Sequence, residues 1–271
     1  MPELPEVHNF KQYFDAAATN QTVDKLVVHD DKIIRNMKGA SFADAMAGRT
    51  IKSSIRRGKY LFAQLDNGHD VLLHFGMNGD LNLYQEEEYR GRFERFAFHF
   101  RDGNILGFDD SRKFARILYL EDREAYIKEI GLGPDALDLE EDYLLDKMAN
   151  RKTTIKGFLL NQKVVAGLGN LYVDDLCYQL RIHPATRVCD LTDGLKSNIY
   201  HKIIEMMTFA TQNAPYYRDY PEKWFWHTWR TEGQPDPETG GEVKVIKVAG
   251  RTTYFVEGRQ KLGAGDSTSD V

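Results

Sequence analysis

The turn KVVAGLGN, residues 163–170, decides how the second half of this 271-residue chain is organised. Two stretches with helical patterns flank it: TTIKGFLLNQ at 153–162 and LYVDDLCYQLRI at 171–182. Glycine permits backbone conformations that other residues avoid. The sequence therefore predicts a tight connection between two helices.

A third helix and a β-hairpin complete this half. The helix is predicted after Thr192, because Ile199, Ile203 and Met206 recur at the spacing of one buried helical face. Residues 243–260, VKVIKVAGRTTYFVEGRQ, alternate between apolar and polar side chains and are typical of a hairpin. We therefore predict a helical domain that ends in a hairpin.

Toward the N-terminus the pattern changes from helices to strands. A helix is predicted over the first ~15 residues after Pro5, since apolar residues recur at helical spacing from Val7 to Phe14. From residue 22 to about 120, short apolar runs alternate with turn residues, and Asp-Asn-Gly at 66–68 is a strong hairpin signal. This half is typical of an antiparallel sandwich or barrel. We predict an α+β chain that begins with an antiparallel β-sandwich carrying an N-terminal helix.

Glycine and proline at 131–134 mark the boundary between the two halves, in a charged stretch. The tail LGAGDSTSDV is small and polar, and we expect it to be disordered. The predicted parts are an N-terminal sandwich domain over 1–121, a linker over 122–134, a helical domain over 135–230, a hairpin over 231–261 and the tail over 262–271.

The composition excludes several classes of protein. Lys and Arg total 36 against 41 Asp and Glu, and hydrophobic residues make up 42%, which is the balance of a globular chain. No apolar run approaches the ~18 residues of a membrane span, and the first residues lack the features of a secretory signal. The two cysteines, Cys177 and Cys189, can build neither a disulfide scaffold nor a four-cysteine zinc site. We therefore expect a cytoplasmic, metal-free protein.

The net charge of −5 hides a segregation of charge along the chain. Residues 148–163 carry four basic side chains and no acid, whereas residues 135–146 carry six acids and no base. A local basic surface attracts phosphate even on an acidic protein, because salt screens charge beyond ~8–10 Å. Such clusters also occur as ordinary solvated faces. Charge alone therefore does not decide whether the protein binds nucleic acid.

The first residues, MPELPEV, contain a candidate nucleophile. If Met1 is removed, Pro2 becomes a free secondary amine, and an α-amino group has a pKa of roughly 8 against about 10.4 for lysine. A neutral fraction therefore exists at neutral pH and can attack an electrophilic carbon. Glu3 and Glu6 stand close enough in sequence to transfer protons. Taken alone, these residues are more typical of an ordinary helix N-terminus.

Six motifs stand at matching spacing along the chain. They are MPELPEV at 1–7, GKYL at 58–61, HFGMNGDL at 74–81, DDSRKFAR at 109–116, VVAGLGNLYVDDL at 164–176 and GRTTYF at 250–255. Together they resemble the formamidopyrimidine-DNA glycosylase / endonuclease VIII family of base-excision repair enzymes. The resemblance implies a DNA glycosylase with abasic-site lyase activity, a helix–two-turn–helix domain, and damaged double-stranded DNA in a cleft between the domains.

The resemblance assigns four residues to catalysis. Pro2 matches the amine that attacks the sugar C1′ of a damaged nucleotide, releases the base and forms a Schiff base, after which elimination cuts the strand. Glu3 matches the acid that protonates the ring oxygen, Glu6 a supporting carboxylate, and Lys59 a lysine that contacts phosphate beside the lesion. No cofactor is implied, because terminal and side-chain groups supply both nucleophile and acid.

Three residues match the side chains that fill the space left when a base leaves the stack, namely Met77, Arg112 and Phe114. A thioether and a flat ring can replace lost stacking, and a guanidinium can hydrogen-bond the orphaned base. Met and Phe are equally common as core residues, but the arginine between polar neighbours favours the functional role.

Three more residues match contacts to DNA phosphates. Lys156 and Asn170 match residues of the helix–two-turn–helix element, where a helix N-terminus suits anions. Arg251 matches the hairpin arginine that grips the phosphates flanking the lesion. Without the other matches, Asn170 is an ordinary helix cap and Arg251 an ordinary solvated residue. The protein is expected to bind DNA as a monomer.

The sequence departs from the family at the zinc finger that ends most bacterial members. The positions of its four cysteines correspond to Asp236, Thr239, Val256 and Arg259, which form no tetrahedral zinc site. We therefore predict a zincless finger whose two strands pack without metal.

Two further departures concern the substrate. Position 8 is commonly Glu in the 8-oxoguanine branch, whereas His8 can donate, accept and titrate, which makes it a candidate base-pocket residue. The loop after 217–220 is short, and three tryptophans follow it: Trp224, Trp226 and Trp229. Aromatic rings there can stack on a base or pack the hairpin in place of zinc, and we predict packing for at least two of them. The set of Met77, Arg112 and Phe114 favours a purine lesion, whereas His8 and the short loop oppose the usual one. The sequence therefore leaves the identity of the lesion open.

Two other interpretations of the chain compete with an enzyme. The first keeps the fold without the chemistry and describes a protein that binds abasic or distorted DNA. The second describes an acidic protein-interaction module. The module predicts DNA affinity with little salt dependence, whereas several phosphate contacts predict a steep dependence.

Overall fold

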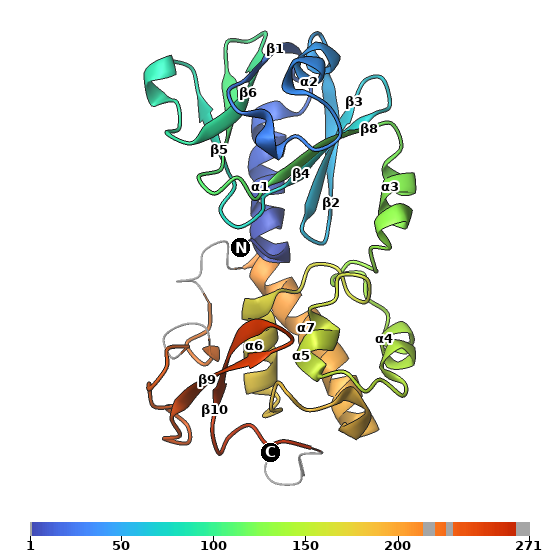
Figure 1. The fold of residues 1–271 in the computed structure, drawn as a ribbon, viewed down its shortest axis with the longest axis vertical. Helices are drawn as coiled ribbons and strands as arrows, with labels where there is room; N and C mark the ends of the chain where they lie inside the picture. Colours follow the sequence, from blue (N-terminus) through green and yellow to red (C-terminus); the bar gives the residue numbers. More distant parts are fainter. Residues whose placement is uncertain (1, 214–219, 226–229, 264–271) are drawn as a thin grey trace. The chain divides into compact units, whose positions relative to one another are not determined.

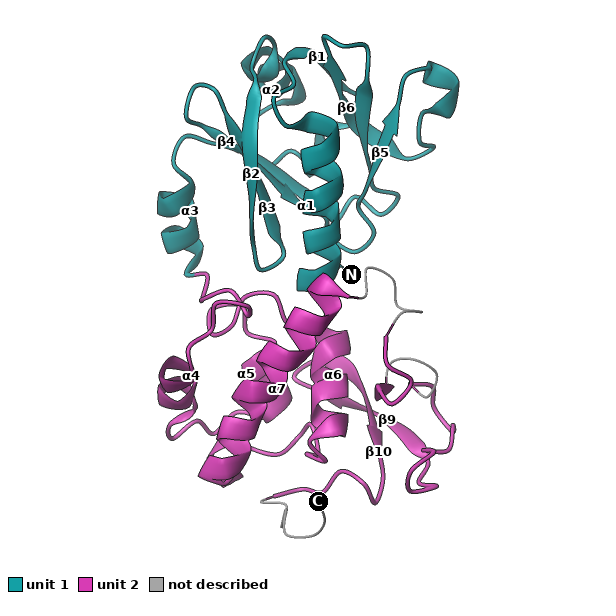
Figure 2. Cartoon of the chain, turned by 180° about the vertical axis from the view of Figure 1, so that it is seen from behind, with its two compact units in different colours: residues 1–131 teal, residues 132–271 magenta. Residues whose placement is uncertain are grey.

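The computed structural model describes residues 2–213, 220–225 and 230–263, and Figure 1 shows how their helices and strands are connected. The chain divides into two compact units, residues 1–131 and 132–271, which Figure 2 colours separately. The stretch expected as a linker, 122–134, contains the boundary between the units. It also contains a helix, α3 (Arg123–Ile130), which the charged sequence did not suggest.

Unit 1 is built from two four-stranded antiparallel sheets with strand orders β1-β6-β7-β5 and β2-β3-β4-β8. This confirms the predicted α+β architecture with an N-terminal sandwich. Its elements before α3 are α1 (Leu4–Ala18), β1 (Val23–Val28), η1 (Asp31–Ile33), α2 (Gly39–Met46), β2 (Ile51–Arg57), β3 (Tyr60–Leu65), β4 (Asp70–His74), β5 (Asp80–Tyr84), η2 (Glu87–Tyr89), β6 (Glu94–Phe100), β7 (Ile105–Asp109) and β8 (Arg116–Leu120).

The Asp-Asn-Gly turn at 66–68 joins β3 to β4, as its sequence predicts. Gly68 has a φ of +84°, a left-handed conformation that glycine adopts without the steric cost of a side chain. The backbone N–H of Gly68 donates to the carbonyl of Leu65 at 3.1 Å and closes the turn. Short turns of this kind fix strand register, because the number of turn residues sets which residues pair.

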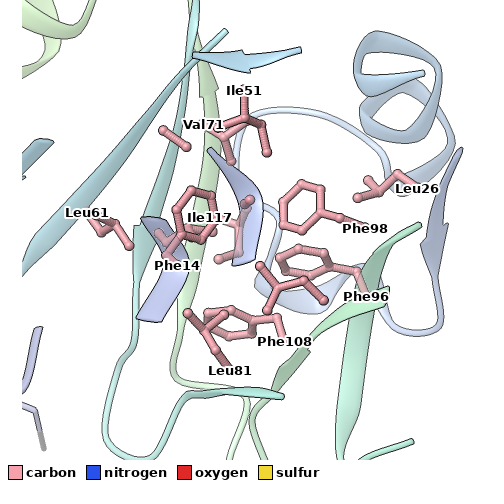
Figure 3. Close-up of a cluster of buried hydrophobic side chains, with 14 of the residues drawn as sticks. Phe14, Leu26, Ile51, Leu61, Val71, Leu81, Phe96, Phe98, Phe108 and Ile117 are labelled. Carbon is pink, nitrogen blue, oxygen red and sulfur yellow. The ribbon is translucent and has the colours of Figure 1, made fainter. Parts of the chain in front are cut away.

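An aromatic core fills the space between the two sheets (Figure 3). Phe96 and Phe108 stack with their ring centroids 5.2 Å apart, and Phe14 from α1 meets Phe98 edge-on at 6.5 Å. Leu61, on the other sheet, joins the same buried cluster. Helix α1 is therefore part of the core, and its N-terminal turn is held in place by the packing of the whole unit.

Unit 2 contains the three predicted helices and the hairpin. Its elements are α4 (Glu141–Met148), α5 (Ile155–Leu159), α6 (Asn170–Gln179), η3 (Val188–Asp190), α7 (Asp193–Gln212), β9 (Val243–Val248) and β10 (Arg251–Val256). Thr192 caps α7, since its side-chain oxygen accepts a hydrogen bond from the backbone N–H of Leu195 at 3.3 Å. Ile199, Ile203 and Met206 are buried, as their spacing predicts. None of the helices in the described ranges is long and apolar enough to cross a membrane.

Candidate functional site

Pro2 stands two residues before the first residue of helix α1 and is half-buried. Glu3 is the N-cap residue and only 4% exposed. It forms a reciprocal capping box with Glu6, whose carboxylate accepts a hydrogen bond from the backbone N–H of Glu3 at 2.7 Å. The helix start thus fixes two carboxyl groups within one turn of Pro2, where they can exchange protons with groups near its nitrogen.

The first turns of α1 are tied to the loop that carries Met77. Phe10 stacks on Phe75 with a centroid separation of 4.2 Å. The next residue, Gly76, lies against the backbone of Phe114, and a Cβ added to it would come within 2.5 Å of the Phe114 carbonyl carbon. Only glycine permits this approach. The β4–β5 loop and the β7–β8 loop therefore lie in direct contact.

The three residues predicted to fill the space of a flipped base lie on these two loops. Met77 is 40% and Phe114 50% exposed, and the guanidinium of Arg112 lies 5.0 Å from the centre of the Phe114 ring. The carboxylate of Asp110, fully buried, accepts hydrogen bonds from the backbone N–H groups of Arg112 at 3.0 Å and Ala115 at 2.8 Å. The loop between them is therefore held in one conformation while its side chains face solvent.

Basic residues gather at the end of the second sheet. Lys59 occupies the β2–β3 turn and is buried, and His74 pairs in register with Arg116. Burial, with the charges of Arg116 and Lys59 nearby, lowers the pKa of His74 to about 4. The backbone N–H of Gly76 donates to Nδ1 of His74 at 3.2 Å, so the proton of the neutral ring sits on Nε2. His74 is thus a neutral hydrogen-bond donor within a positively charged surface, a residue the sequence argument missed.

The β2–β3 turn and the N-terminal end of α1 lie at the same end of unit 1 in both views (Figures 1 and 2). This end therefore carries Pro2, Glu3 and Glu6 from one motif and Lys59 from a second. His8 lies one turn further along α1, half-buried, with its Nε2 3.4 Å from the side-chain amide of Gln12. Its role toward a base stays a prediction.

The glycine turn in unit 2 is braced by one side chain. Gln162 donates to the carbonyls of Leu160 at 3.0 Å and Leu168 at 2.8 Å, and its own carbonyl accepts from the N–H of Gly167 at 3.0 Å. Gly167 has a φ of +117°, which requires glycine. Asn170 follows as the first residue of α6, as its motif predicts. The turn thereby delivers the N-terminal end of α6 in a fixed position.

Lys156 does not lie on a surface, which corrects the expectation that its ammonium faces the DNA backbone. Its side chain is 0% exposed, and its Nζ lies 2.5 Å from Oδ1 of Asp174, which is also fully buried. Burial lowers the pKa of Lys156, and the charge of Asp174 opposes this shift. A buried ion pair needs further partners, and Arg230 supplies one by donating to the other carboxylate oxygen of Asp174 at 3.0 Å.

The same groups hold the hairpin. The Nδ2 of Asn170 and the Nζ of Lys156 both donate to the carbonyl of Thr252, at 3.0 and 3.3 Å, and Asp174 accepts from the backbone N–H of Tyr254 at 3.3 Å. Two residues predicted to bind phosphate thus converge on the backbone next to Arg251.

The hairpin turn presents Arg251 to solvent. Ala249 and Gly250 both have positive φ, +50° and +72°, the geometry of a two-residue type I′ turn. Arg251 follows as the first residue of β10, paired with Val248 and exposed. Its guanidinium is free to reach an anion while its backbone is fixed.

The four positions that correspond to zinc ligands in the family do not fit a zinc ion. Only Asp236 carries a good zinc donor, and Arg259 carries a positive charge that repels a metal. Instead, the Asp236 carboxylate accepts hydrogen bonds from the Tyr178 hydroxyl at 2.5 Å and from Thr239, while Arg259 lies 4.0 Å over the Tyr178 ring. Val256 is buried beside them. Among the described residues, no group of three or more His, Cys, Asp or Glu side chains could hold a metal.

Trp224 is 2% exposed and packs against Phe209 and Tyr220, with centroid distances of 5.5 and 5.1 Å. Trp224 is therefore a packed residue, with ring contacts to α7 and to Tyr220, and its predicted role in packing the hairpin stays a prediction. Trp226, Trp229 and the loop residues 217–219 lie outside the described residues.

Comparison with known proteins identifies relatives over both units. Residues 1–117 match the family profile for the formamidopyrimidine-DNA glycosylase N-terminal domain, and residues 130–215 match that for its H2TH domain. A formamidopyrimidine-DNA glycosylase from Desulforamulus reducens is 31% identical over 96% of this chain and 99% of its own. One from Arabidopsis thaliana is 29% identical over 98% of this chain and 73% of its own. The Lactococcus lactis enzyme, solved with DNA that contains an abasic site, superposes with a TM-score of 0.87 at 25% identity, covering 96% of this chain and 99% of that one.

The pKa of His74 predicts how stability depends on pH. Because the folded state holds this pKa near 4 and the unfolded chain near 6.5, protonation favours unfolding. The wild type should have its full stability above pH 6.5 and lose ~3 kcal/mol of unfolding free energy as the pH falls to 4. His74→Gln should lack this loss in urea titrations across that range. His201→Gln, at an exposed histidine, serves as the control, and equal slopes for His74→Gln and wild type would refute the assignment.

Removal of one partner from the buried ion pair should be costly. Lys156→Met leaves the Asp174 carboxylate buried beside Arg230 with one charge partner fewer, and we expect a loss of ~3–5 kcal/mol of unfolding free energy. Urea denaturation measures this loss. Lys152→Met, at an exposed lysine of the same segment, should change stability little. A loss no larger for Lys156→Met than for the control would contradict the structural role of the pair.

Proposed function

Because the chain belongs to the formamidopyrimidine-DNA glycosylase family, we propose that its reaction runs through the amine of Pro2. The chain is a DNA glycosylase of base-excision repair with abasic-site lyase activity. The observation that carries the proposal is the capping box, which holds Glu3 and Glu6 within one helical turn of Pro2. Met1 must be removed, since a peptide nitrogen has no lone pair available for attack.

The chemistry proceeds from a neutral amine and a buried acid. The lone pair of the Pro2 nitrogen forms a bond to C1′ while the bond from C1′ to the base breaks, and the base leaves with the electrons of the broken bond and takes a proton from water. The nitrogen then gives up its own N–H proton to water, which leaves a neutral amine on C1′. Glu3 donates a proton to the sugar ring oxygen, so that the ring opens and an iminium forms. Loss of a C2′ proton to water turns the iminium into an enamine, whose electrons then expel the 3′ phosphate and cleave the strand. Glu6 acts as a positioning residue, because its carboxylate holds the backbone N–H of Glu3.

The phosphates beside the lesion bind at the basic end of unit 1. Lys59 supplies a charge there, and His74 supplies an Nε2–H that stays a donor at neutral pH. A neutral donor avoids the like-charge repulsion that a second cation beside Lys59 would suffer. Charged and neutral donors together suit a phosphodiester, which carries one negative charge over several acceptor oxygens.

Met77, Arg112 and Phe114 enter the stack when the damaged nucleotide leaves it. Extrusion of a base costs a few kcal/mol, which a thioether, a ring and a guanidinium can offset by packing and hydrogen bonding. Support comes from their exposure and from the two loops that carry them side by side.

In unit 2, Arg251 and the N-terminal end of α6 bind phosphates. Asn170 contributes at that helix end and also holds the Thr252 carbonyl. Lys156 acts differently from its first assignment: it positions the hairpin from within the unit and so sets where Arg251 points.

The solved relatives suggest which substrates to test first. One lactococcal structure holds N7-benzyl-Fapy-dG DNA, and a MutM structure holds carbocyclic 8-oxo-G DNA. We assign oxidised or ring-opened bases as the substrate class. We propose that the enzyme works as a monomer, without zinc or cofactor, in the cytoplasm, and at the nucleoid if the cell is bacterial.

Borohydride trapping on abasic duplex DNA tests the chemistry. Reduction of the iminium should give a covalent adduct with the wild type, and Pro2→Gly should lower its yield, since a primary amine replaces the secondary one. Mass spectrometry should show a chain that begins at Pro2. Lys196→Ala, far from the motifs in sequence, is the matched control. Tight, salt-dependent binding of the wild type without any adduct would instead support a protein that recognises abasic DNA without chemistry.

The metal-free hairpin has its own test. Incubation with EDTA should leave the adduct yield unchanged, because Asp236, Thr239, Val256 and Arg259 hold no zinc. Arg259→Ala should lower the unfolding free energy by roughly 2–3 kcal/mol, through lost charged hydrogen bonds and the contact with the Tyr178 ring. Arg187→Ala, which removes an exposed arginine paired with Asp190, should leave stability unchanged. Loss of the adduct with EDTA and its return with zinc would refute the metal-free assignment.

A further inference from the structure

Lys113 stands between two side chains that serve the DNA, yet its own side chain turns away from them. Its Nζ lies 2.5 Å from a carboxylate oxygen of Asp30, the residue that caps η1 after strand β1. Arg112 and Phe114, by contrast, lie together with the guanidinium 5.0 Å from the ring centre. The loop therefore divides its side chains between solvent and an ion pair with another part of unit 1.

The backbone of Lys113 requires such an anchor. Its φ is +57°, in the left-handed region that residues other than glycine seldom occupy and that raises the energy of the loop. A strained residue persists where surrounding contacts hold it. The left-handed backbone at Lys113 also turns its side chain away from those of its neighbours. The strained backbone and the ion pair with Asp30 therefore occur together.

Arg95 connects this ion pair to the base of the loop. Its guanidinium lies 3.5 Å from the same Asp30 oxygen, and its Nε donates to the carbonyl of Asp110 at 2.7 Å. Asp110 in turn accepts the backbone N–H of Arg112. The hydrogen bond from Lys113 holds the pKa of Asp30 below its ordinary value, so the carboxylate stays charged at neutral pH. These four residues form a continuous chain of charged contacts behind the exposed loop.

We propose that Lys113 and Asp30 are positioning residues that hold Arg112 and Phe114 in the conformation that enters the DNA stack. The proposal rests on the proposed function, because it assigns a means to the insertion step. A loop ordered before binding avoids the entropy cost of ordering in the complex, which raises the fraction of encounters that extrude the damaged base.

Lys113 could instead bind a phosphate directly, and removal of either charge separates the two roles. A direct contact predicts that Asp30→Asn strengthens DNA binding, since it removes a negative charge beside the lysine. It also predicts that Lys113→Ala lowers the slope of log K against log salt concentration by about one. The positioning role predicts that both variants weaken insertion alike and that the slope is unchanged.

The experiment places 2-aminopurine opposite a stable abasic-site analogue and follows its fluorescence as side chains enter the stack. In the same series, single-turnover excision is measured on 8-oxoguanine duplexes. We expect Lys113→Ala and Asp30→Asn each to lower the insertion signal and the excision rate roughly three- to tenfold, as small displacements of positioned groups do. The double variant should be no worse than either single one, and Lys113→Arg should restore most of the loss. Lys196→Ala, which removes a lysine from an ion pair with Asp193, is the matched control.

Several results would overturn the positioning role. Wild-type insertion by Lys113→Ala, stronger binding by Asp30→Asn, or additive losses in the double variant would each do so. Lys113→Gly relieves the backbone strain without the ion pair, so full insertion by this variant would also count against it. Failure of the proposed function appears separately, because it abolishes the borohydride adduct of the wild type, whereas the 2-aminopurine signal depends on binding alone.

Discussion

A carboxylate taken out of water needs partners for its charge, and this constraint organises the functional surface of each unit. In unit 1 the buried Asp110 accepts two backbone N–H groups and thereby shapes the loop 110–115. In unit 2 the buried Asp174 accepts one lysine, one arginine and one backbone N–H, and thereby ties the helices to the hairpin 243–256. Three of the side chains assigned to DNA, Arg112, Phe114 and Arg251, stand on these two segments. In each unit a buried carboxylate, Asp110 or Asp174, fixes the backbone that carries an exposed arginine, Arg112 or Arg251.

This arrangement explains how an acidic chain can present basic surfaces. The acidic run 135–146 supplies the first turn of α4, whereas Lys59 and Arg116 gather at one end of the sandwich. Salt screens charges beyond ~8–10 Å, so a phosphate near Lys59 responds mainly to its local field. Lys156 shows the limit of counting charges along a sequence. Its charge is neutralised by an acid inside the unit, and its ammonium also holds the backbone carbonyl next to Arg251.

Local pattern predicted the parts of the fold that depend on neighbours in sequence. The N-terminal helix, the turn at 66–68 and the cap at Thr192 all follow from residues within a few positions of one another. Helices α3 and α4 escaped prediction because both lie in charged stretches where few apolar residues mark a buried face. The partner of Lys156 stands 18 positions away on another helix, so only the fold shows that the pair exists. A usable signal was present, since an acid on the buried face of an apolar helix such as α6 requires a cation nearby.

The hairpin raises a question of magnitude. A structural zinc contributes ~10–16 kcal/mol in finger peptides, whereas a hydrogen bond such as those around Asp236 contributes ~0.5–1.5 kcal/mol, and about 3 at most when charged. Such bonds cannot replace a metal in an isolated hairpin. The remainder must come from packing on the helices, where Tyr178 stacks on Phe225 at 4.7 Å and Val243 and Val256 are buried with them. Each buried side chain of this kind contributes ~1.5–3 kcal/mol. A metal-bound finger can order by itself, whereas this hairpin draws its stability from packing on the helices, so the contact proposed between Arg251 and DNA depends on the core of that unit.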